Sequence, residues 1–144
     1  MTYTELENKV IDSLKGIYGY NEARSVQRLL FATLSRLEPS GYLLIRQDEA
    51  GADFVNGVMQ AVAQLLEYEP IQYVLGETCF CGFDFFVRPG VLIPRPETEL
   101  LVHKIVDKYK GKAGTKVLDI GTGSGAIGVS LGLLMNKPEI TAID

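Results

Sequence analysis

The stretch Asp119-Ile120-Gly121-Thr122-Gly123-Ser124-Gly125-Ala126-Ile127-Gly128 decides the fold of the second half of the chain. It follows a β-branched apolar run that predicts a strand over residues 116–120, and it opens an apolar run that predicts a helix over 126–135. A second strand is expected over 139–143. A strand, a glycine-rich turn, a helix and another strand form a β-α-β unit, with parallel strands and a right-handed crossover.

The residues of this turn suit the binding of an adenosine compound. Glycines let the backbone turn sharply and let a ligand approach without meeting a Cβ atom. The start of the following helix directs unpaired amides and a positive dipole end into the same crevice. A carboxylate at the tip of the second strand can accept both hydroxyls of a ribose. The predicted site comprises Asp119, Gly121, Thr122, Gly123, Ser124, Gly125 and Asp144.

Three interpretations of the turn stay open at this point. The pattern also fits the G-x-G-x-x-A of nicotinamide and flavin enzymes, through Gly121, Gly123 and Ala126. Asp119 argues against a dinucleotide, because its carboxylate would repel a pyrophosphate and attract the ammonium of a methionine moiety. Gly125 also completes a G-x-G-x-G pattern. A methyltransferase is therefore favoured over a dinucleotide enzyme and over a purely structural turn.

The first 70 residues predict helices and no strand. A first helix begins at Thr2 or Thr4 and ends at Gly19. A second is expected to be capped by Asn21 and to be broken by Glu38-Pro39-Ser40-Gly41, a short helical run follows over 42–45, and a third long helix covers 54–66. The apolar positions that recur at helical spacing are expected in the core; they are Leu6, Val10, Leu14, Ile17, Val26, Leu29, Leu30, Leu34, Phe54, Val55, Val58, Met59, Val62, Leu65 and Leu66.

Residues 71–96 predict a connecting segment. After a short helix that Pro70 can open, aromatic and β-branched runs over 78–80 and 83–87 flank Gly82 and predict a β-hairpin. The residues before Pro94 and Pro96 must be extended, and Pro96 suits the first position of a helix. That helix is expected to present Leu101, Ile105, Val106 and Tyr109 on one side and to be closed by Gly111 and Gly114.

Composition restricts the remaining possibilities. The chain has 144 residues, of which 47% are apolar and 22% are charged. Its net charge of −4 lacks the overall excess of positive charge that is typical of nucleic-acid-binding proteins. No run of 18 apolar residues predicts a transmembrane helix, and the polar start carries no signal peptide. Cys79 and Cys81 are expected on one face of a strand as small buried thiols, and with His103 the only histidine no metal site is predicted.

The sequence resembles a known family at several points. Residues 117–128 look like motif I of class I methyltransferases. The stretch Leu92-Ile-Pro-Arg-Pro-Glu-Thr-Glu99, together with Pro70-Ile-Gln-Tyr-Val-Leu-Gly76 and the strand over 83–87, resembles the release-factor glutamine N5-methyltransferases, the HemK/PrmC family. The stretch over 96–99 favours this branch over the ribosomal-protein glutamine methyltransferases. The resemblance is sharp over residues 68–144.

The resemblance implies a fold and a set of roles. It implies a class I, Rossmann-like α/β methyltransferase domain starting in 97–144, a hairpin and linker over 71–96, and a small all-α domain over 1–70 that helps to hold a release factor. Carried over by position, Gly121 to Gly125 would line S-adenosylmethionine and Asp144 would bind its ribose. Asp119 would face the methionine ammonium. Arg95, Pro96, Glu97 and Thr98 would lie near the mouth of the active site, unless they form only a rigid linker.

The family's Asn-Pro-Pro-Tyr motif, which orients the substrate amide, does not occur in this sequence. We therefore expect a methyltransferase domain truncated after its first β-α-β unit, no catalytic residue within the chain, and no activity of the chain alone. The whole protein is expected to be a cytoplasmic monomer that binds neither nucleic acid nor membrane. The alternatives are a nicotinamide-dependent Rossmann enzyme and a chain that acts only as a protein-binding module.

Overall fold

The computed structural model describes residues 1–37 and 39–144, which divide into two compact units, Met1–Leu75 and Gly76–Asp144. The division falls inside the segment 71–96 that the sequence predicts as a connection. Each unit has its own hydrophobic core, and each is described separately.

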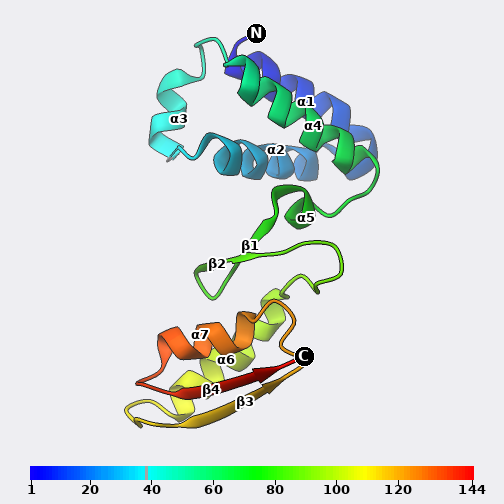
Figure 1. The fold of residues 1–144 in the computed structure, drawn as a ribbon. Helices are drawn as coiled ribbons and strands as arrows, with labels where there is room; N and C mark the ends of the chain where they lie inside the picture. Colours follow the sequence, from blue (N-terminus) through cyan, green and yellow to red (C-terminus); the bar gives the residue numbers. More distant parts are fainter. Residues whose placement is uncertain (38) are drawn as a thin grey trace. The chain divides into compact units, whose positions relative to one another are not determined.

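The first unit is helical, as predicted. Its elements are α1 (Tyr3–Tyr18), α2 (Tyr20–Ser35), α3 (Pro39–Ile45), α4 (Ala52–Leu66) and α5 (Ile71–Leu75), coloured blue to green in Figure 1. No strand lies in the described residues before Leu75, although one isolated antiparallel bridge pairs Thr2 with Glu49. The Thr2 hydroxyl accepts from the amide of Glu5 at 3.2 Å, and the Glu5 carboxylate accepts from the amide of Thr2 at 2.8 Å. This capping box fixes the start of α1.

The helix boundaries correct two predictions. Gly19, with a φ of 75°, ends α1 and also precedes α2, so Asn21 lies inside α2 and does not cap it. The second helix ends earlier than predicted, at Ser35, where Arg36 adopts a left-handed φ of 54°. Pro39 to Gly41 then form the first turn of α3, because proline is tolerated where a helix amide has no partner. Glu38, part of the predicted break, lies outside the described residues.

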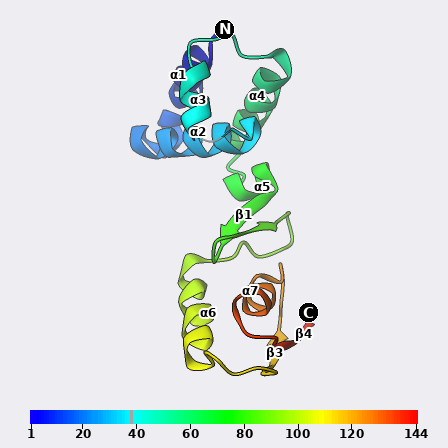
Figure 2. The ribbon, with the colours of Figure 1, turned by 90° about the vertical axis from the view of Figure 1, so that its left-hand side faces the viewer.

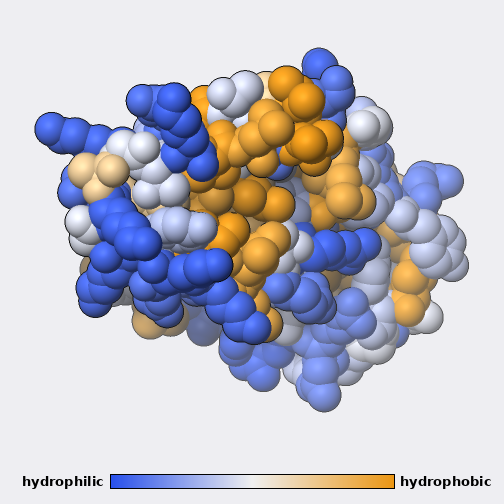
Figure 3. All heavy atoms as spheres, turned by 90° about the horizontal axis from the view of Figure 1, so that it is seen from below, coloured by the Kyte–Doolittle hydropathy of each residue, from blue (hydrophilic) through white to orange (hydrophobic). Residues whose placement is uncertain are grey.

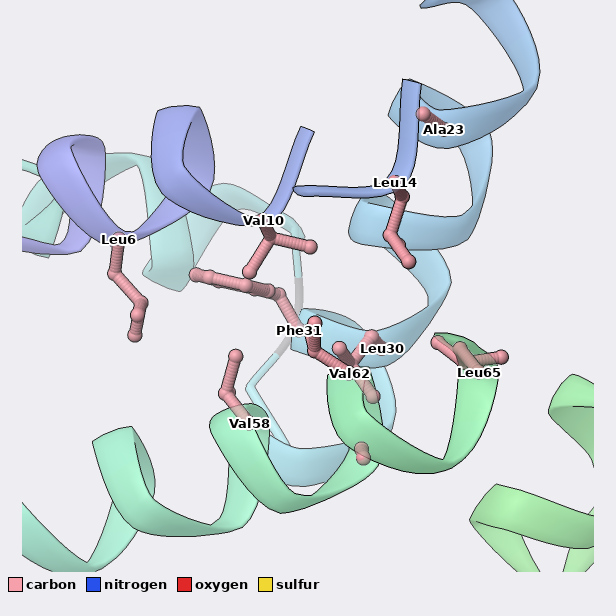
Figure 4. Close-up of a cluster of buried hydrophobic side chains, with 10 residues drawn as sticks. Leu6, Val10, Leu14, Ala23, Leu30, Phe31, Val58, Val62 and Leu65 are labelled. Carbon is pink, nitrogen blue, oxygen red and sulfur yellow. The ribbon is translucent and has the colours of Figure 1, made fainter. Parts of the chain in front are cut away.

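The core of the helical unit is formed where three helices meet. Figure 4 shows Leu6, Val10 and Leu14 of α1 facing side chains of α2 and α4. Four aromatic rings extend this core at one end, with centroids 5.2–6.0 Å apart; they are Tyr3, Phe31, Tyr42 and Phe54. Edge-to-face arrangements of this kind stabilise a core beyond the area they bury.

Several expected core positions are exposed instead. They are Ile17, Leu29, Leu34 and Leu66. The buried stripe of α2 runs through Ala23, Gln27, Leu30 and Phe31, at intervals of three and four residues. The prediction for α2 was correct for Leu30, which is buried, and for Val26, which packs against the core, and it was wrong for Leu29 and Leu34. A helix buries a narrow face, and here small and polar residues occupy part of that face.

The second unit begins with the predicted hairpin, β1 (Glu77–Phe80) and β2 (Phe83–Phe86). Its two-residue turn has positive φ at both Cys81 (52°) and Gly82 (80°), as a type I′ turn requires. Cys81 therefore lies in the turn and not on the strand, and Cys79 is exposed, so the expectation of two buried thiols on one strand face was wrong. Cys81 is only partly buried, and this partial burial raises the pKa of its thiol.

The hairpin belongs to the core of the second unit. Phe80 and Phe85 are buried with Val102 of α6 (Pro96–Lys108) and Leu131 of α7 (Ala126–Leu134). The backbone amide of Cys81 also donates to the Glu99 carboxylate of α6 at 3.0 Å. The hairpin is thus packed onto the α/β unit as well as preceding it in the sequence.

The strands β3 (Lys116–Ile120) and β4 (Glu139–Ile143) pair in parallel, with Lys116 opposite Glu139 and Ile120 opposite Ile143. Figure 2 shows α7 between α6 and the two strands. A strand directs alternate side chains to opposite faces. Val117 and Ile140 are packed into the core, whereas Leu118, Ile120 and Ile143 are exposed and form what we term the β3–β4 face. Figure 3 shows the molecule of Figure 1 from below, where apolar residues gather among hydrophilic ones.

Candidate functional site: the glycine-rich turn

The predicted β-α-β unit forms with the expected strand bounds, and its turn is held by the strand ends on both sides. The backbone carbonyl of Ile143 accepts from the amides of Gly121 at 2.8 Å and Thr122 at 3.1 Å. The Asp144 carboxylate accepts from the amide of Gly123 at 3.3 Å. The structure therefore brings Asp144 to the middle of the turn, 21 residues away in sequence.

Three glycines of the turn have conformations that other residues rarely adopt. Gly121, Gly123 and Gly125 have φ values of 73°, 54° and 77°. A Cβ atom on Gly121 or Gly123 would meet no atom within 4 Å, so open space borders the backbone there. Glycine is therefore required at these two positions by backbone conformation and not by crowding within the chain.

Asp119 has an additional role that its position in the motif did not predict. It is only 8% exposed. Its Oδ2 atom accepts from the Thr122 hydroxyl at 2.9 Å and from the backbone amide of Gly128 at 3.1 Å. The carboxylate thus joins the end of β3 to the turn and to the first turn of α7. In the described part of the chain no hydrogen bond reaches Oδ1.

Gly128 is a residue whose role the sequence interpretation missed. A Cβ atom there would stand 3.1 Å from Asp119 Oδ2 and 3.4 Å from the Ile140 side chain. Glycine thus allows α7 to approach the strands closely enough for its amide to bond the carboxylate. The sequence signal was present, because Gly128 is a glycine at the third position of α7, within its first turn.

The turn leaves several backbone donors available. Within the described residues, the amides of Ser124, Ala126 and Ile127 have no hydrogen-bond acceptor in the protein. The first amides of a helix normally lack partners inside the helix and attract anionic or polar groups. Together with the open space beside Gly121 and Gly123 and the carboxylate of Asp144, these donors form a surface that can bind a polar ligand.

The second group of predicted site residues starts α6. Arg95 precedes the helix with an extended backbone, Pro96 is its first residue, and the amide of Thr98 donates to the carbonyl of Arg95 at 2.9 Å. Arg95, Pro96 and Glu97 are exposed. Within the described residues no hydrogen bond joins this segment to the glycine-rich turn, so its place near an active site stays a prediction.

Two further properties bear on the kind of site. Among the described residues, no group of three or more histidine, cysteine, aspartate or glutamate side chains could hold a metal ion. No described helix combines the length and the apolar character needed to cross a membrane.

The fold and this site define a class: a helical domain followed by a hairpin and a parallel β-α-β unit with a glycine-rich, ligand-accessible turn. Comparison with known proteins identifies the family within this class. The family model of the PrmC N-terminal domain matches residues 5–76, half of the chain. The chain therefore belongs to the PrmC family.

Curated relatives extend the similarity into the second unit. The release factor glutamine methyltransferase of Bacillus subtilis is 33% identical over 143 residues, which cover 94% of this chain and 50% of that protein. The protein of the same name from Bacteroides thetaiotaomicron is 35% identical over 132 residues, covering 92% of this chain and 47% of that protein. The release factor glutamine methyltransferase of Bordetella pertussis is 48% identical over 85 residues, which cover 59% of this chain and 32% of that protein. The chain thus spans at most about half the length of these relatives.

Proposed function

We propose that the whole protein transfers a methyl group from S-adenosylmethionine to the side-chain amide nitrogen of a glutamine in a peptide-chain release factor. The observation that carries this proposal is membership of a family whose curated relatives are named release factor glutamine methyltransferases. The geometry of the glycine-rich turn supports it, because open space, unpaired amides and an acid lie together there. We further propose that the protein acts in the cytoplasm.

The residues of this chain would bind and orient the methyl donor. When bound, S-adenosylmethionine supplies an electrophilic methyl group on a sulfonium. The Asp144 carboxylate would accept hydrogen bonds from the ribose, and the turn from Gly121 to Gly125 would lie along the ribose and methionine part. Asp119 would attract the methionine ammonium through Oδ1, the oxygen not engaged within the protein.

The reaction itself would depend on positioning. The lone pair of an amide nitrogen is delocalised, so this nitrogen is a weak nucleophile. The nitrogen would form a bond to the methyl carbon while the carbon–sulfur bond breaks and the sulfur keeps the electron pair. The nitrogen would then release a proton to solvent water. Holding the reacting atoms in line can supply a large part of the rate. We propose no catalytic residue within residues 1–144, and we propose that this chain alone is inactive.

The whole protein provides the test. Incubated with a purified release factor and isotopically labelled S-adenosylmethionine, it should label one glutamine, located by peptide mass spectrometry. Label on another residue type, or no label, would contradict the proposed reaction. Retention of a nicotinamide cofactor and not of S-adenosylmethionine would instead support a dinucleotide enzyme.

Asp144→Ala in the whole protein should weaken binding of S-adenosylmethionine. Two hydrogen bonds to a charged acceptor are lost, each contributing roughly 1.5–3 kcal/mol. Gly123→Val should weaken binding more, because a branched side chain would occupy the open space beside the turn and force an unfavourable φ. Asp107→Ala, which removes an exposed acid of α6, is the control. If calorimetry finds that Asp144→Ala binds S-adenosylmethionine as tightly as the control does, Asp144 does not contribute to the binding site.

A further inference from the structure

Exposed lysines gather at the edge of the second unit where its two parallel strands begin. We term them the lysine cluster; they are Lys108 at the end of α6, Lys110 and Lys112 in the loop that follows, and Lys137 in the loop before β4. In Figure 1 both loops lie at the end of the strands away from the C-terminus. Because the glycine-rich turn follows the other end of β3, the lysine cluster is separate from the site described above.

Tertiary structure brings Lys137 to the rest of the lysine cluster. The backbone amide of Gly114, two residues after Lys112, donates to the carbonyl of Lys137 at 3.2 Å. Lys137 adopts a left-handed φ of 47° while it makes this bond. That conformation is unfavourable for a residue with a side chain, so it persists only where the surrounding structure holds it. The two loops are therefore fixed beside each other.

Tyr109 gathers two members of the lysine cluster. The Nζ atoms of Lys108 and Lys112 lie 5.5 and 5.3 Å from the centroid of its ring. An aromatic face attracts an ammonium group at such a distance. Two positive charges held against one ring also repel each other. A ligand that carries several closely spaced negative charges would relieve this repulsion.

The charge of the lysine cluster is not compensated within the described residues. The neighbouring Lys116 pairs with Glu139 at 3.5 Å, so the charges of these two residues offset each other. The four members of the cluster form no ion pair in the described part of the chain, and neither does Asp107, the acid that precedes Lys108. The net charge of −4 is a sum over the whole chain and conceals this local excess of positive charge.

The residue types favour phosphate groups as the complement. All four members are lysines, and the sequence has no arginine after Arg95. Carboxylates are typically recognised by the paired donors of arginine, whereas lysine presents a point charge on a flexible stem. Such point charges suit a chain of phosphates, which requires charge and little fixed geometry. A membrane is disfavoured, because a basic patch anchors poorly without an apolar or lipid group, and Tyr109 is half-buried.

We propose that the lysine cluster binds the phosphate backbone of a polynucleotide without reading its base sequence. Each of the four lysines neutralises phosphate charge, and Tyr109 keeps two of them in place. The proposal replaces the expectation of no nucleic-acid binding, which rested on the net charge. It goes beyond the proposed methyl transfer, and it holds or fails without regard to the reaction that the whole protein performs.

The test is fluorescence anisotropy of short labelled oligonucleotides titrated with the 144-residue chain. Single-stranded RNA and DNA of one mixed sequence should bind within about threefold of each other, since contacts to phosphates carry no sequence information. The logarithm of the binding constant should fall against the logarithm of salt concentration with a slope of about −3, because each neutralised phosphate contributes about −0.7. K110Q/K137Q should halve this slope and weaken binding about tenfold at physiological salt.

R24Q/R28Q is the matched control. It also removes two positive charges, from exposed arginines of α2 in the other unit that form no ion pair within the described residues. It should keep the slope and bind within about twofold of the unaltered chain, because its arginines lie outside the lysine cluster. Circular dichroism of K110Q/K137Q should match that of the unaltered chain, since both of its lysines are exposed.

Several results would overturn the proposal. They are the absence of binding by the chain or by the whole protein, equal binding by K110Q/K137Q and R24Q/R28Q, and a preference of more than about tenfold for one base sequence or for one of the two nucleic acids. Competition distinguishes other anions. If polyglutamate or vesicles of anionic lipid displace the labelled strand better than unlabelled RNA does at equal charge, the lysine cluster binds an acidic protein or a membrane, and the proposal is also overturned.

Discussion

At the scale of single residues, Gly128 shows how closely α7 and the strands are fitted. Gly128→Ala would place a Cβ atom against Asp119 Oδ2 at 3.1 Å and Ile140 at 3.4 Å. Moving Asp119 away would also strain its bond to the Thr122 hydroxyl. We expect this variant to destabilise the second unit by roughly 1–3 kcal/mol. Faster hydrogen exchange of the amides of β3 and α7 would measure the loss.

Gly132→Ala is the matched control in the same helix. A Cβ atom there would have its nearest neighbour at 3.9 Å, an ordinary contact. Alanine in place of glycine within a helix then stabilises by roughly 0.5–1 kcal/mol. The two substitutions should therefore act in opposite directions, and a loss of stability at both positions would contradict the close approach inferred for Gly128 alone.

Tyr42 makes the helical unit sensitive to alkaline pH. Burial raises the pKa of its phenol, and the hydrogen bond to Glu7 raises that pKa further. The folded state holds the proton more tightly than the unfolded state, whose tyrosine pKa is about 10. The resulting stabilisation is complete below about pH 10 and is lost as the pH rises from there towards the folded pKa. Unfolding by urea at a series of pH values should show this decline.

Tyr42→Phe should lower the free energy of unfolding at neutral pH by roughly 1–3 kcal/mol, because the Glu7 carboxylate loses a donor. It should also reduce the decline above about pH 10. Tyr20→Phe removes the hydroxyl of a largely exposed tyrosine and should change neither quantity. A decline of the same size in Tyr42→Phe would show that other groups cause it.

At the scale of elements, α4 should be far more protected than β3 and β4. Val58, Val62 and Leu65 of α4 are at most 2% exposed, whereas Ile120 of β3 is 72% exposed. Amides beneath a fully packed face exchange only when the unit opens. We expect the amides of residues 53–66 to exchange at least tenfold more slowly than those of 116–143 in the isolated chain. Equal rates in a monomer would show that the two strands and α7 form a unit as stable as the helices.

The sequence predicted where the elements begin and end better than it predicted which side of each helix is buried. The bounds of β3 and β4 were predicted to the residue, helped by Gly121, which directly follows β3, and by Pro138, which directly precedes β4. The buried faces of α2 and α6 were predicted only in part, because the burial of Ala23, Gln27 and Val102 depends on which neighbour each helix meets. The helical start at Pro39 was missed for a related reason: proline both ends and begins helices.

Within the candidate site, the sequence predicted that Asp144 would be near the turn, since parallel strands end at one edge of a sheet. It could not predict that Asp119 bonds Thr122 and Gly128, because the position of a side chain relative to a later helix is set by tertiary packing. The roles of Arg95, Pro96, Glu97 and Thr98 stay predictions for the same reason. Their distance from a ligand depends on packing that a motif does not specify.

At the scale of the whole molecule, the β3–β4 face should make the 144-residue chain self-associate. Leu118, Ile120 and Ile143 expose apolar surface, and an exposed strand edge carries unpaired backbone groups. We expect the apparent mass from sedimentation equilibrium to rise with protein concentration. Ile120→Lys should shift the chain towards the monomer, whereas Leu29→Lys, a matched change at an exposed leucine of α2, should not. A chain that stays monomeric at all concentrations would contradict this expectation.

The bonds that tie the glycine-rich turn to Ile143, Asp144 and Asp119 have a consequence for the kinetics of ligand capture. Folding itself has already ordered this segment, so an arriving molecule meets a preformed turn and need not wait for a loop to close. The entropic penalty of ordering is then absent from association. Capture should proceed in a single exponential phase whose rate rises linearly with ligand concentration, and selectivity should reside in how quickly each ligand escapes.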